Sequence, residues 1–286
     1  MLGSRRVLAS KVYGPLTAAR RPLSAQRFVR TMAQYRPDKP TVIDLPVSNN
    51  GARVSTVSFF ADLEVRWIIY KKGLEQQYAI VSPKEIGGFK SDIHMALHPL
   101  GKVPCLGTPD GLCLAESEVL VQYIADKHKG VGPSLEASTP EKRALAHQAV
   151  RFQDLYILNI FASMYRKMDK EPRAEQIGQI NTQLDNLEKL VVGPYVVGDE
   201  LTTADGSLLP NLCWMNYILP QLFGWENVFK NRPKLAACWQ TIQQDEAASK
   251  VIAELHEALD NWKNNGRWKD VGVLEHVKDK SFQWSY

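Results

Sequence analysis

The sequence predicts a two-domain protein, in which an α/β domain of order β-α-β-α-β-β-α precedes an all-helical domain. Its 286 residues are too many for one small core and fit two modest domains. Short β-branched segments alternate with helical patterns up to about residue 131, and only helical patterns follow Pro133. We expect the domains at 53–131 and 137–262, with an aromatic tail at 263–286.

Local patterns place the elements of the first domain. β-branched and aromatic residues predict strands at 54–60, 77–81, 102–106 and 112–114, and the Thr-Pro-Asp-Gly turn at 108–111 joins the last two as a hairpin. Apolar residues at helical spacing predict a helix over 63–73, which Gly73 can end. The segment 86–96 is a polar loop with room for a turn of helix, and 116–128 has one apolar helical face.

The second domain contains five helical patterns, at 140–168, 174–192, 202–218, 233–244 and 247–262. The first pattern has Thr139 as its N-cap, Pro140 as its first helical residue and Glu141 as an acid in its first turn. Thr202 and Asp205 have the spacing of a capping box before the third, so we expect them to be structural.

The first 37 residues differ in charge from the rest of the chain. They hold eight basic residues, and the first acid is Asp38, so removing them changes the net charge from +4 to −4. The segment is rich in Arg, Ala and Ser, which predicts an organellar transit peptide at 1–37, mitochondrial rather than plastid; a disordered basic tail is the alternative. Met32 offers a second start that would give a cytoplasmic form. Residues 38–52, rich in Pro, Asn and Gly, are interpreted as a linker.

Several classes of protein are disfavoured. No apolar stretch approaches the roughly 20 residues of a membrane span, and the acidic body should not attract nucleic acid. The four cysteines lie far apart without a CxxC pair, which argues against a zinc site or a disulfide scaffold. His94 and His98 are four residues apart, but no third ligand is apparent and Pro99 ends any helix, so we expect no metal.

The stretch HPLGKVPCL, residues 98–106, has a proline where a buried strand is expected. Proline removes a hydrogen-bond donor from a sheet, so Pro104 marks either an edge strand or a place where the backbone of Val103 faces a ligand. The residues themselves leave both readings open.

Glu116 and Ser117 stand where the last strand meets its helix. A helix N-terminus offers free N–H groups and favours a carboxylate ligand, and an acid beside it can bind an ammonium group. The alternative is that Ser117 simply caps its own helix.

These motifs together resemble the glutathione transferase family, over about residues 54–262. The resemblance implies a thioredoxin-like first domain with a cis-proline at Pro104. Val103 would pair with the cysteinyl unit of glutathione, and Glu116 and Ser117 would bind its γ-glutamyl end. Lys90 and Lys102 match basic positions of the family and would meet the glycine carboxylate. Two departures follow. His98 replaces the usual Asn, which should cost a turn hydrogen bond, and Gly206 should weaken the apolar contact beside the capping box.

The family's catalytic position is not obvious in this sequence. Aligning the helix 63–73 with the family places Phe59 or Phe60 where a Ser or Cys is expected, and neither can donate a hydrogen bond to the glutathione sulfur. Ser58 is the nearest donor, and the amides at the helix start could stabilise a thiolate unaided. A Cys-type thiol transferase is disfavoured because this stretch has no cysteine.

The resemblance therefore implies an enzyme that conjugates glutathione, as co-substrate and without a further cofactor, to electrophilic apolar small molecules for detoxification. It also implies a homodimer. A non-catalytic glutathione-binding or interaction protein is the first alternative, which Phe59 and Phe60 favour. A glutathione-dependent isomerase is the second, although its serine-rich catalytic stretch is missing.

Overall fold

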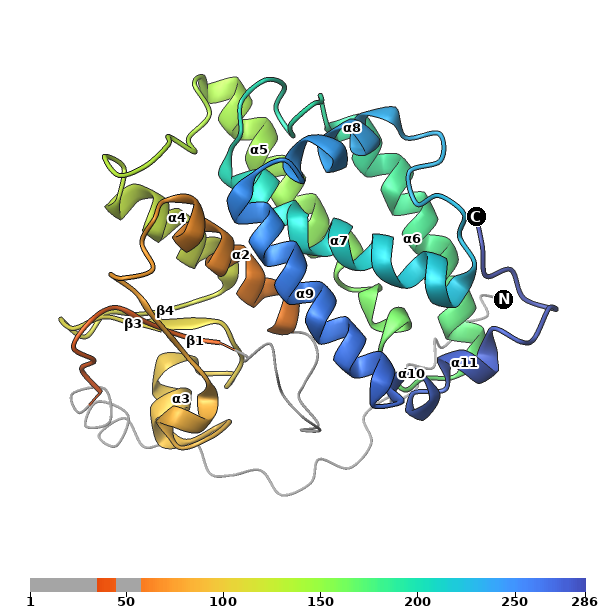
Figure 1. Ribbon diagram of the computed structural model, residues 1–286, viewed down its shortest axis with the longest axis horizontal. Coiled ribbons are helices and arrows are strands. Elements are labelled where there is room, and N and C mark those ends of the chain that lie inside the picture. Colours follow the sequence, from red (N-terminus) through yellow and green to blue (C-terminus); the bar gives the residue numbers. More distant parts are fainter. Residues whose placement is uncertain (1–34, 45–57) are drawn as a thin grey trace, which may run out of the picture.

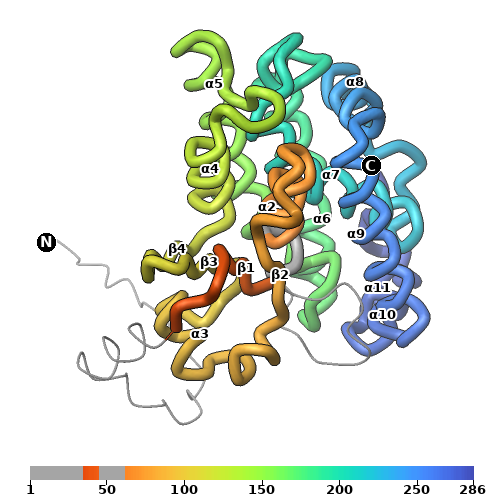
Figure 2. Tube along the Cα trace, turned by 60° about the vertical axis from the view of Figure 1, so that its left-hand side comes forward, coloured from red at the N-terminus to blue at the C-terminus, as the bar shows by residue number. Residues whose placement is uncertain are grey.

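The computed structural model describes residues 35–44 and 58–286, and shows a sheet domain beside a helical domain (Figure 1). The sheet contains β1 (Thr41–Ile43), β2 (Ala79–Val81), β3 (Cys105–Gly107) and β4 (Cys113–Ala115), in the order β2-β1-β3-β4. Figure 2 shows the four strands side by side in this order. β1 is parallel to β2 and antiparallel to β3, which is antiparallel to β4. This is the predicted thioredoxin-like arrangement.

Helices cover both faces of the sheet. The short 3₁₀ helix η1 (Pro83–Ile86) and α3 (Asp92–Leu97) follow β2, and α3 lies on one face in Figure 1. The other face carries α2 (Ser58–Lys71) and α4 (Ser117–Lys127), and these two helices separate the sheet from the helical domain.

The first strand was predicted in the wrong place. β1 is Thr41–Ile43, inside the segment interpreted as a linker, and Val42 and Ile43 are fully buried. Of the predicted strand 54–60, residues 58–60 belong to α2, while 54–57 lie outside the described residues. Three β-branched residues suffice for this strand because β2 and β3 pair with it on both sides. The prolines and asparagines that flank Thr41–Ile43 favoured the interpretation of this stretch as a linker, so the strand was not predicted.

The fold also begins earlier than the predicted leader boundary. Tyr35 lies against Gly107 of β3, where an added Cβ would be 2.8 Å from its ring. Arg36 Nη1 donates to the carbonyl oxygen of Pro109 at 3.4 Å. Residues 35–37 therefore belong to the folded domain, and only 1–34 of the predicted transit peptide lie outside the described residues.

The second domain is helical, as predicted. Its main helices are α5 (Pro140–Phe152), α6 (Lys170–Leu190), α7 (Thr203–Phe223), α8 (Pro233–Ile242) and α9 (Glu246–Asn264). The pattern at 140–168 is not one helix, because α5 is followed by the π-helix η2 (Gln153–Ile157) and the 3₁₀ helix η3 (Phe161–Met164). The carbonyl groups freed by this break are used elsewhere: buried Arg173 donates to those of Ser163 and Arg166.

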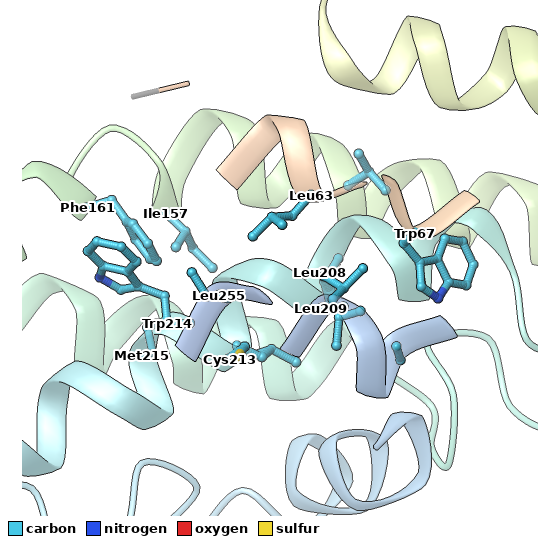
Figure 3. Packing of buried hydrophobic residues seen from close by; sticks show 14 of the residues in the cluster. Leu63, Trp67, Ile157, Phe161, Leu208, Leu209, Cys213, Trp214, Met215 and Leu255 are labelled. Carbon is cyan, nitrogen blue, oxygen red and sulfur yellow. The ribbon is translucent and has the colours of Figure 1, made fainter. Parts of the chain in front are cut away.

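Aromatic residues fill the centre of the helical domain. Trp214 of α7 is fully buried, and its ring lies 5.6 Å from Tyr165 and 5.5 Å from Trp262 between ring centres. Figure 3 shows Phe161 and Ile157 on the same side of this core. Phe161 and Tyr165 are therefore core residues, and not the lining of an open pocket between the domains.

The two domains share one core through α2 and α7. Leu63 and Trp67 of α2 lie beside Leu208 and Leu209 of α7 (Figure 3). A Cβ added to Gly206 would lie 2.0 Å from the Trp67 ring. The expectation of a weaker apolar contact was wrong, since the missing side chain is what admits the tryptophan.

The C-terminal tail is ordered and packs on the helical domain. It includes the short helices α10 (Arg267–Asp270) and α11 (Val273–His276). Trp284 is buried, and its carbonyl oxygen accepts a hydrogen bond from Trp225 Nε1 at 2.8 Å. Within the described ranges, no helix is both long and apolar enough to cross a bilayer.

Candidate functional site

The candidate site is built around the start of β3. The Val103–Pro104 peptide bond is cis, as the resemblance implied. Val103 lies two residues before Cys105, the first residue of the strand, and among the described residues its backbone N–H and C=O have no hydrogen-bond partner. An edge with unpaired backbone groups can accept an extended peptide as an added strand. The Val103 side chain is buried, which fixes this backbone in place.

The start of α4 supplies the second part of the site. Ser117 is the first residue of α4, and Glu116 precedes it with φ 73° and ψ 122°, a conformation that costs a non-glycine residue about 1–3 kcal/mol. No side chain caps this helix, so the alternative in which Ser117 caps α4 is wrong. The first amides of α4 and the exposed Glu116 carboxylate, 68% accessible, are therefore available to a ligand.

His98 joins the two parts. Its Nδ1 accepts a hydrogen bond from the backbone N–H of Leu100 at 3.2 Å, so the replacement of Asn costs no turn hydrogen bond. Its Nε2 lies 3.8 Å from Glu116 Oε1. The ring is 3% exposed, and burial lowers its pKa although the charge of Glu116 raises it, so the imidazole is neutral with its proton on Nε2. The expectation that His98 costs a turn hydrogen bond was wrong.

His94 connects the two lysine segments. It is fully buried, its Nδ1 accepts from the backbone N–H of Lys90 at 3.0 Å, and its Nε2 contacts the carbonyl oxygen of Lys102 at 2.8 Å. Because Nδ1 accepts, Nε2 carries the proton and donates. Burial lowers the pKa of His94. His94 and His98 thus each hold the backbone of a turn. The described residues contain no group of three or more His, Cys, Asp or Glu side chains that could hold a metal ion.

Lys90 and Lys102 are brought close together on the surface. Lys90 has φ 59°, and its Cγ would lie 2.8 Å from a Cβ added to Gly101, the residue before Lys102. Both side chains are exposed, and neither has an ion-pair partner within the described part of the chain. Lys90 and Lys102 together form a basic surface beside the start of β3, which we call the basic edge.

The catalytic candidate Ser58 is only partly placed. It is the first residue of α2 in the backbone, while its side chain and those of Phe59 and Phe60 lie outside what the structure describes, as does the segment 45–57. Because β1 ends at Ile43, that segment joins the first strand to α2. Burial raises the pKa of the Cys105 thiol beside the cis-proline, which suits a core residue and not a nucleophile.

Comparisons with known proteins identify the family of the chain. The family model described as Glutathione S-transferase, N-terminal domain matches residues 63–127, and the C-terminal domain model matches 155–254. Glutathione S-transferase D7 of Drosophila melanogaster is 24% identical over 206 residues, which are 69% of this chain and 91% of the relative. Glutathione S-transferase L3 of Arabidopsis thaliana is 24% identical over 192 residues, 67% of this chain and 77% of the relative.

Solved structures show the same fold. Glutathione transferase F2 from Populus trichocarpa superposes with a TM-score of 0.61 at 20% identity, over 76% of this chain and 99% of that one. Gtt2 from Saccharomyces cerevisiae gives 0.58 at 20% identity, over 74% and 99%. The two family models together span more than half of the residues, and the chain belongs to the glutathione S-transferase family.

Proposed function

We propose that the protein binds glutathione at this site and joins its thiolate to electrophilic, largely apolar small molecules, in a detoxifying role. One observation carries the proposal: the backbone groups of Val103 have no hydrogen-bond partner among the described residues, and the start of α4 at Ser117 has no side-chain cap. A tripeptide with a zwitterionic end needs both features. Membership in the family supports the reaction class, and the apolar electrophile is an expectation from the sequence.

Each part of glutathione has a partner in this proposal. The backbone of Val103 pairs with the cysteinyl unit. The Ser117 hydroxyl and the first amides of α4 bind the γ-glutamyl carboxylate, while Glu116 binds the ammonium group. Lys90 and Lys102 bind the glycine carboxylate at the basic edge.

The thiolate is stabilised from the start of α2. Ser58 is the proposed donor, assisted by the free amides of the helix N-terminus, since both favour the charged sulfur. Because the joining segment 45–57 lies between β1 and α2, its hydroxyl residues Ser48, Ser55 and Thr56 are the further candidates.

Binding and activation are tested together by titrating the protein with glutathione at neutral pH. Calorimetry gives the affinity, and the ultraviolet difference band of the thiolate reports ionised sulfur. We expect Glu116→Ala and Ser117→Ala each to weaken glutathione binding about tenfold, a loss typical of a charged hydrogen bond. Glu136→Ala, an exposed acid away from β3, is the control.

Three outcomes separate the alternatives. A thiolate band supports conjugation, which a standard aromatic halide electrophile then tests directly. Saturable binding without a band leaves a glutathione-binding protein that does not conjugate. Unchanged affinity in both site variants would mean that glutathione does not bind at the start of α4.

We further propose that two copies associate through an apolar groove between α5 and α6. The groove has a volume of about 390 Å³, and its apolar lining includes the exposed Leu155 and Tyr156. Leu100, in the turn before β3, is a large apolar residue that is 62% exposed in a single chain. Insertion of Leu100 from each copy into the groove of the other would bury both features in one symmetric contact.

Light scattering tests this association. Leu100→Asp should shift the particle mass from that of two chains to that of one, because it places a charge in the apolar contact. Leu274→Asp changes an equally apolar exposed residue on α11 and should leave the mass unchanged. A single-chain mass for the unaltered protein would rule out the dimer.

We also propose that residues 1–34 direct the protein to mitochondria, on the basis of their basic, acid-free composition. A fusion of this segment to a fluorescent protein should colocalise with a mitochondrial dye. Removal of residues 1–31, so that Met32 is the start, should leave the fusion in the cytoplasm. Plastid signal or diffuse fluorescence from the full segment would contradict the proposal.

A further inference from the structure

Three arginine side chains at one end of the helical domain have no carboxylate partner. Arg166 follows η3, Arg173 lies in the first turn of α6, and Arg267 is the first residue of α10. None of the three forms an ion pair within the described part of the chain. The remaining residues, 1–34 and 45–57, contain no Asp or Glu that could supply a partner. The glutathione site proposed above uses none of these arginines.

Arg173 fixes the backbone that carries Arg166 and places a charge beneath it. Its guanidinium is fully buried and donates to the carbonyl oxygens of Ser163, Arg166 and Val271, and from Nε to Nδ1 of His276. Burial lowers the pKa of Arg173 to about 10, so the group stays charged at neutral pH. A buried positive charge therefore lies under this surface, and only neutral acceptors contact it.

Arg267 is held in place by two contacts. Its Cζ lies 5.3 Å from the centre of the Trp262 ring, and its Nη2 donates to the carbonyl oxygen of Tyr165 at 3.3 Å. Arg166 contacts the same tyrosine, with its Cζ 5.8 Å from the centre of the Tyr165 ring. A guanidinium that is already fixed loses little freedom when it binds a ligand, and its planar fork matches a carboxylate.

This arginine surface lies on the helical-domain side of the proposed site. Figure 1 shows α10 and the beginning of α2 in the lower half of the molecule. Figure 3 shows Leu63 of α2 beside Ile157, with Phe161 and Trp214 next to them. Trp214 in turn packs against Tyr165, with 5.6 Å between the ring centres. The first turns of α2 and the segment that carries Arg166 are thus joined by one aromatic core.

We propose that Arg166 and Arg267 are specificity-determining residues that bind a carboxylate group on the electrophile. The inference rests on the proposed function and narrows its substrates to apolar molecules that carry one acidic group. Residues 38–286 have a net charge of −4, so the folded chain as a whole repels an anion. The unpaired arginines reverse the sign of the charge locally, and charge-assisted hydrogen bonds from a guanidinium to a carboxylate are among the strongest in proteins.

The test compares 4-chloro-3,5-dinitrobenzoate with 4-chloro-3,5-dinitrobenzamide, which differ in charge and hardly in shape. In both, the glutathione thiolate forms a C–S bond at the carbon that carries chlorine, and the chlorine leaves as chloride with the bonding electron pair. The kcat/KM for each compound at saturating glutathione is divided by its uncatalysed rate with glutathione, which corrects for ring activation. We expect the unaltered protein to prefer the acid about tenfold, and this preference to fall about threefold between about 0.05 M and 0.5 M NaCl.

Variants assign the preference to the two arginines. Arg166→Gln and Arg267→Gln should each lower the corrected rate for the acid about fivefold, and the rate for the amide far less. Arg267→Lys, which keeps the charge without the planar fork, should retain part of the preference and gives a second reading if Arg267→Gln fails to fold. Arg143→Gln is the matched control, because this guanidinium on α5 pairs with Glu136, and it should keep the full preference.

The outcomes separate this inference from the proposed function. Equal corrected rates for the acid and the amide, or an unchanged preference in Arg166→Gln and Arg267→Gln, would overturn the role of the arginines while conjugation itself stands. Weaker glutathione binding in these variants, without a change in preference, would assign the arginines to glutathione and would also overturn it. If the unaltered protein conjugates neither compound, the proposed function fails and the role of the arginines fails with it.

Discussion

His98 Nε2 lies 3.8 Å from Glu116 Oε1, so a buried imidazole in the turn before β3 faces the strained acid before α4. The same ring accepts the Leu100 N–H through Nδ1. The His98 side chain therefore orders the turn that leads to Val103. It also points its Nε2 proton toward Glu116, the acid proposed to bind the ammonium group of glutathione. The two halves of the proposed glutathione site are coupled through this residue.

The first prediction separates the two roles of His98. His98→Asn keeps an acceptor for the Leu100 N–H, so its melting temperature should stay close to that of the unaltered protein. It cannot reach Glu116, so glutathione affinity should fall about threefold. His98→Ala should lose both contacts, with a destabilisation of about 1–3 kcal/mol from the space left by the buried ring and from the lost hydrogen bond of the Leu100 N–H. Equal affinity of His98→Asn and the unaltered protein would show that the contact with Glu116 has no part in binding.

The second prediction concerns acid stability. Burial lowers the pKa of His94 in the folded protein, while the unfolded chain takes up a proton near the ordinary value of about 6.5. The unfolded state therefore binds more protons just below that pH, and stability should fall as the pH drops below about 6.5. His94→Gln keeps an acceptor and a donor for the Lys90 and Lys102 backbones, so this part of the acid sensitivity should disappear.

Urea unfolding at about pH 7 and about pH 5.5 measures that difference. His147→Gln, in which the replaced ring is more than half exposed, is the matched control and should lose stability with acid as the unaltered protein does. The same acid loss in His94→Gln would assign the sensitivity to other groups.

The third prediction locates the thiolate donor. If Ser58 donates to the glutathione sulfur, Ser58→Ala should raise the pKa of the bound thiol and lower conjugation about 10²-fold, as loss of one donor to a developing charge does elsewhere. Ser48→Ala, Ser55→Ala and Thr56→Val are measured beside it through the same ultraviolet titration. A loss confined to one of these three variants would move the donor into the joining segment.

The sequence predicted the architecture well where patterns are long. The change from alternating elements to helices and the hairpin at 108–111 depend on local signals several residues in extent, whereas the cis-proline was implied by the family resemblance. It failed at β1, because Thr41–Ile43 is a three-residue strand whose stability comes from two neighbouring strands that the local sequence does not reveal. It also failed in the segment after Phe152, where the carbonyl groups of Ser163 and Arg166 are satisfied by the side chain of Arg173 on the next helix, α6.

The candidate site could be read from the sequence only in part. Val103, Glu116 and Ser117 were named from their motifs, whereas His98 was expected to cost a hydrogen bond of its turn. The structure shows instead that His98 Nδ1 accepts from the Leu100 N–H and that His98 Nε2 faces Glu116 at the start of another element. A contact between two elements leaves no local pattern in the sequence.

The last prediction tests the junction between the domains. A Cβ at Gly206 would lie 2.0 and 2.2 Å from two carbons of the Trp67 ring, so α7 or the indole must move in Gly206→Ala. We expect a destabilisation of about 1–3 kcal/mol by urea unfolding, the usual cost of overfilling a core. Gly130→Ala, where an added Cβ has nothing within 4 Å, is the control and should change stability little. Trp67→Phe makes the ring smaller and also removes an indole N–H that lacks a partner among the described residues. Combined with Gly206→Ala, it should therefore recover most of the stability that Gly206→Ala alone loses. Simple additivity of the two changes would show that the glycine is not there to admit the tryptophan.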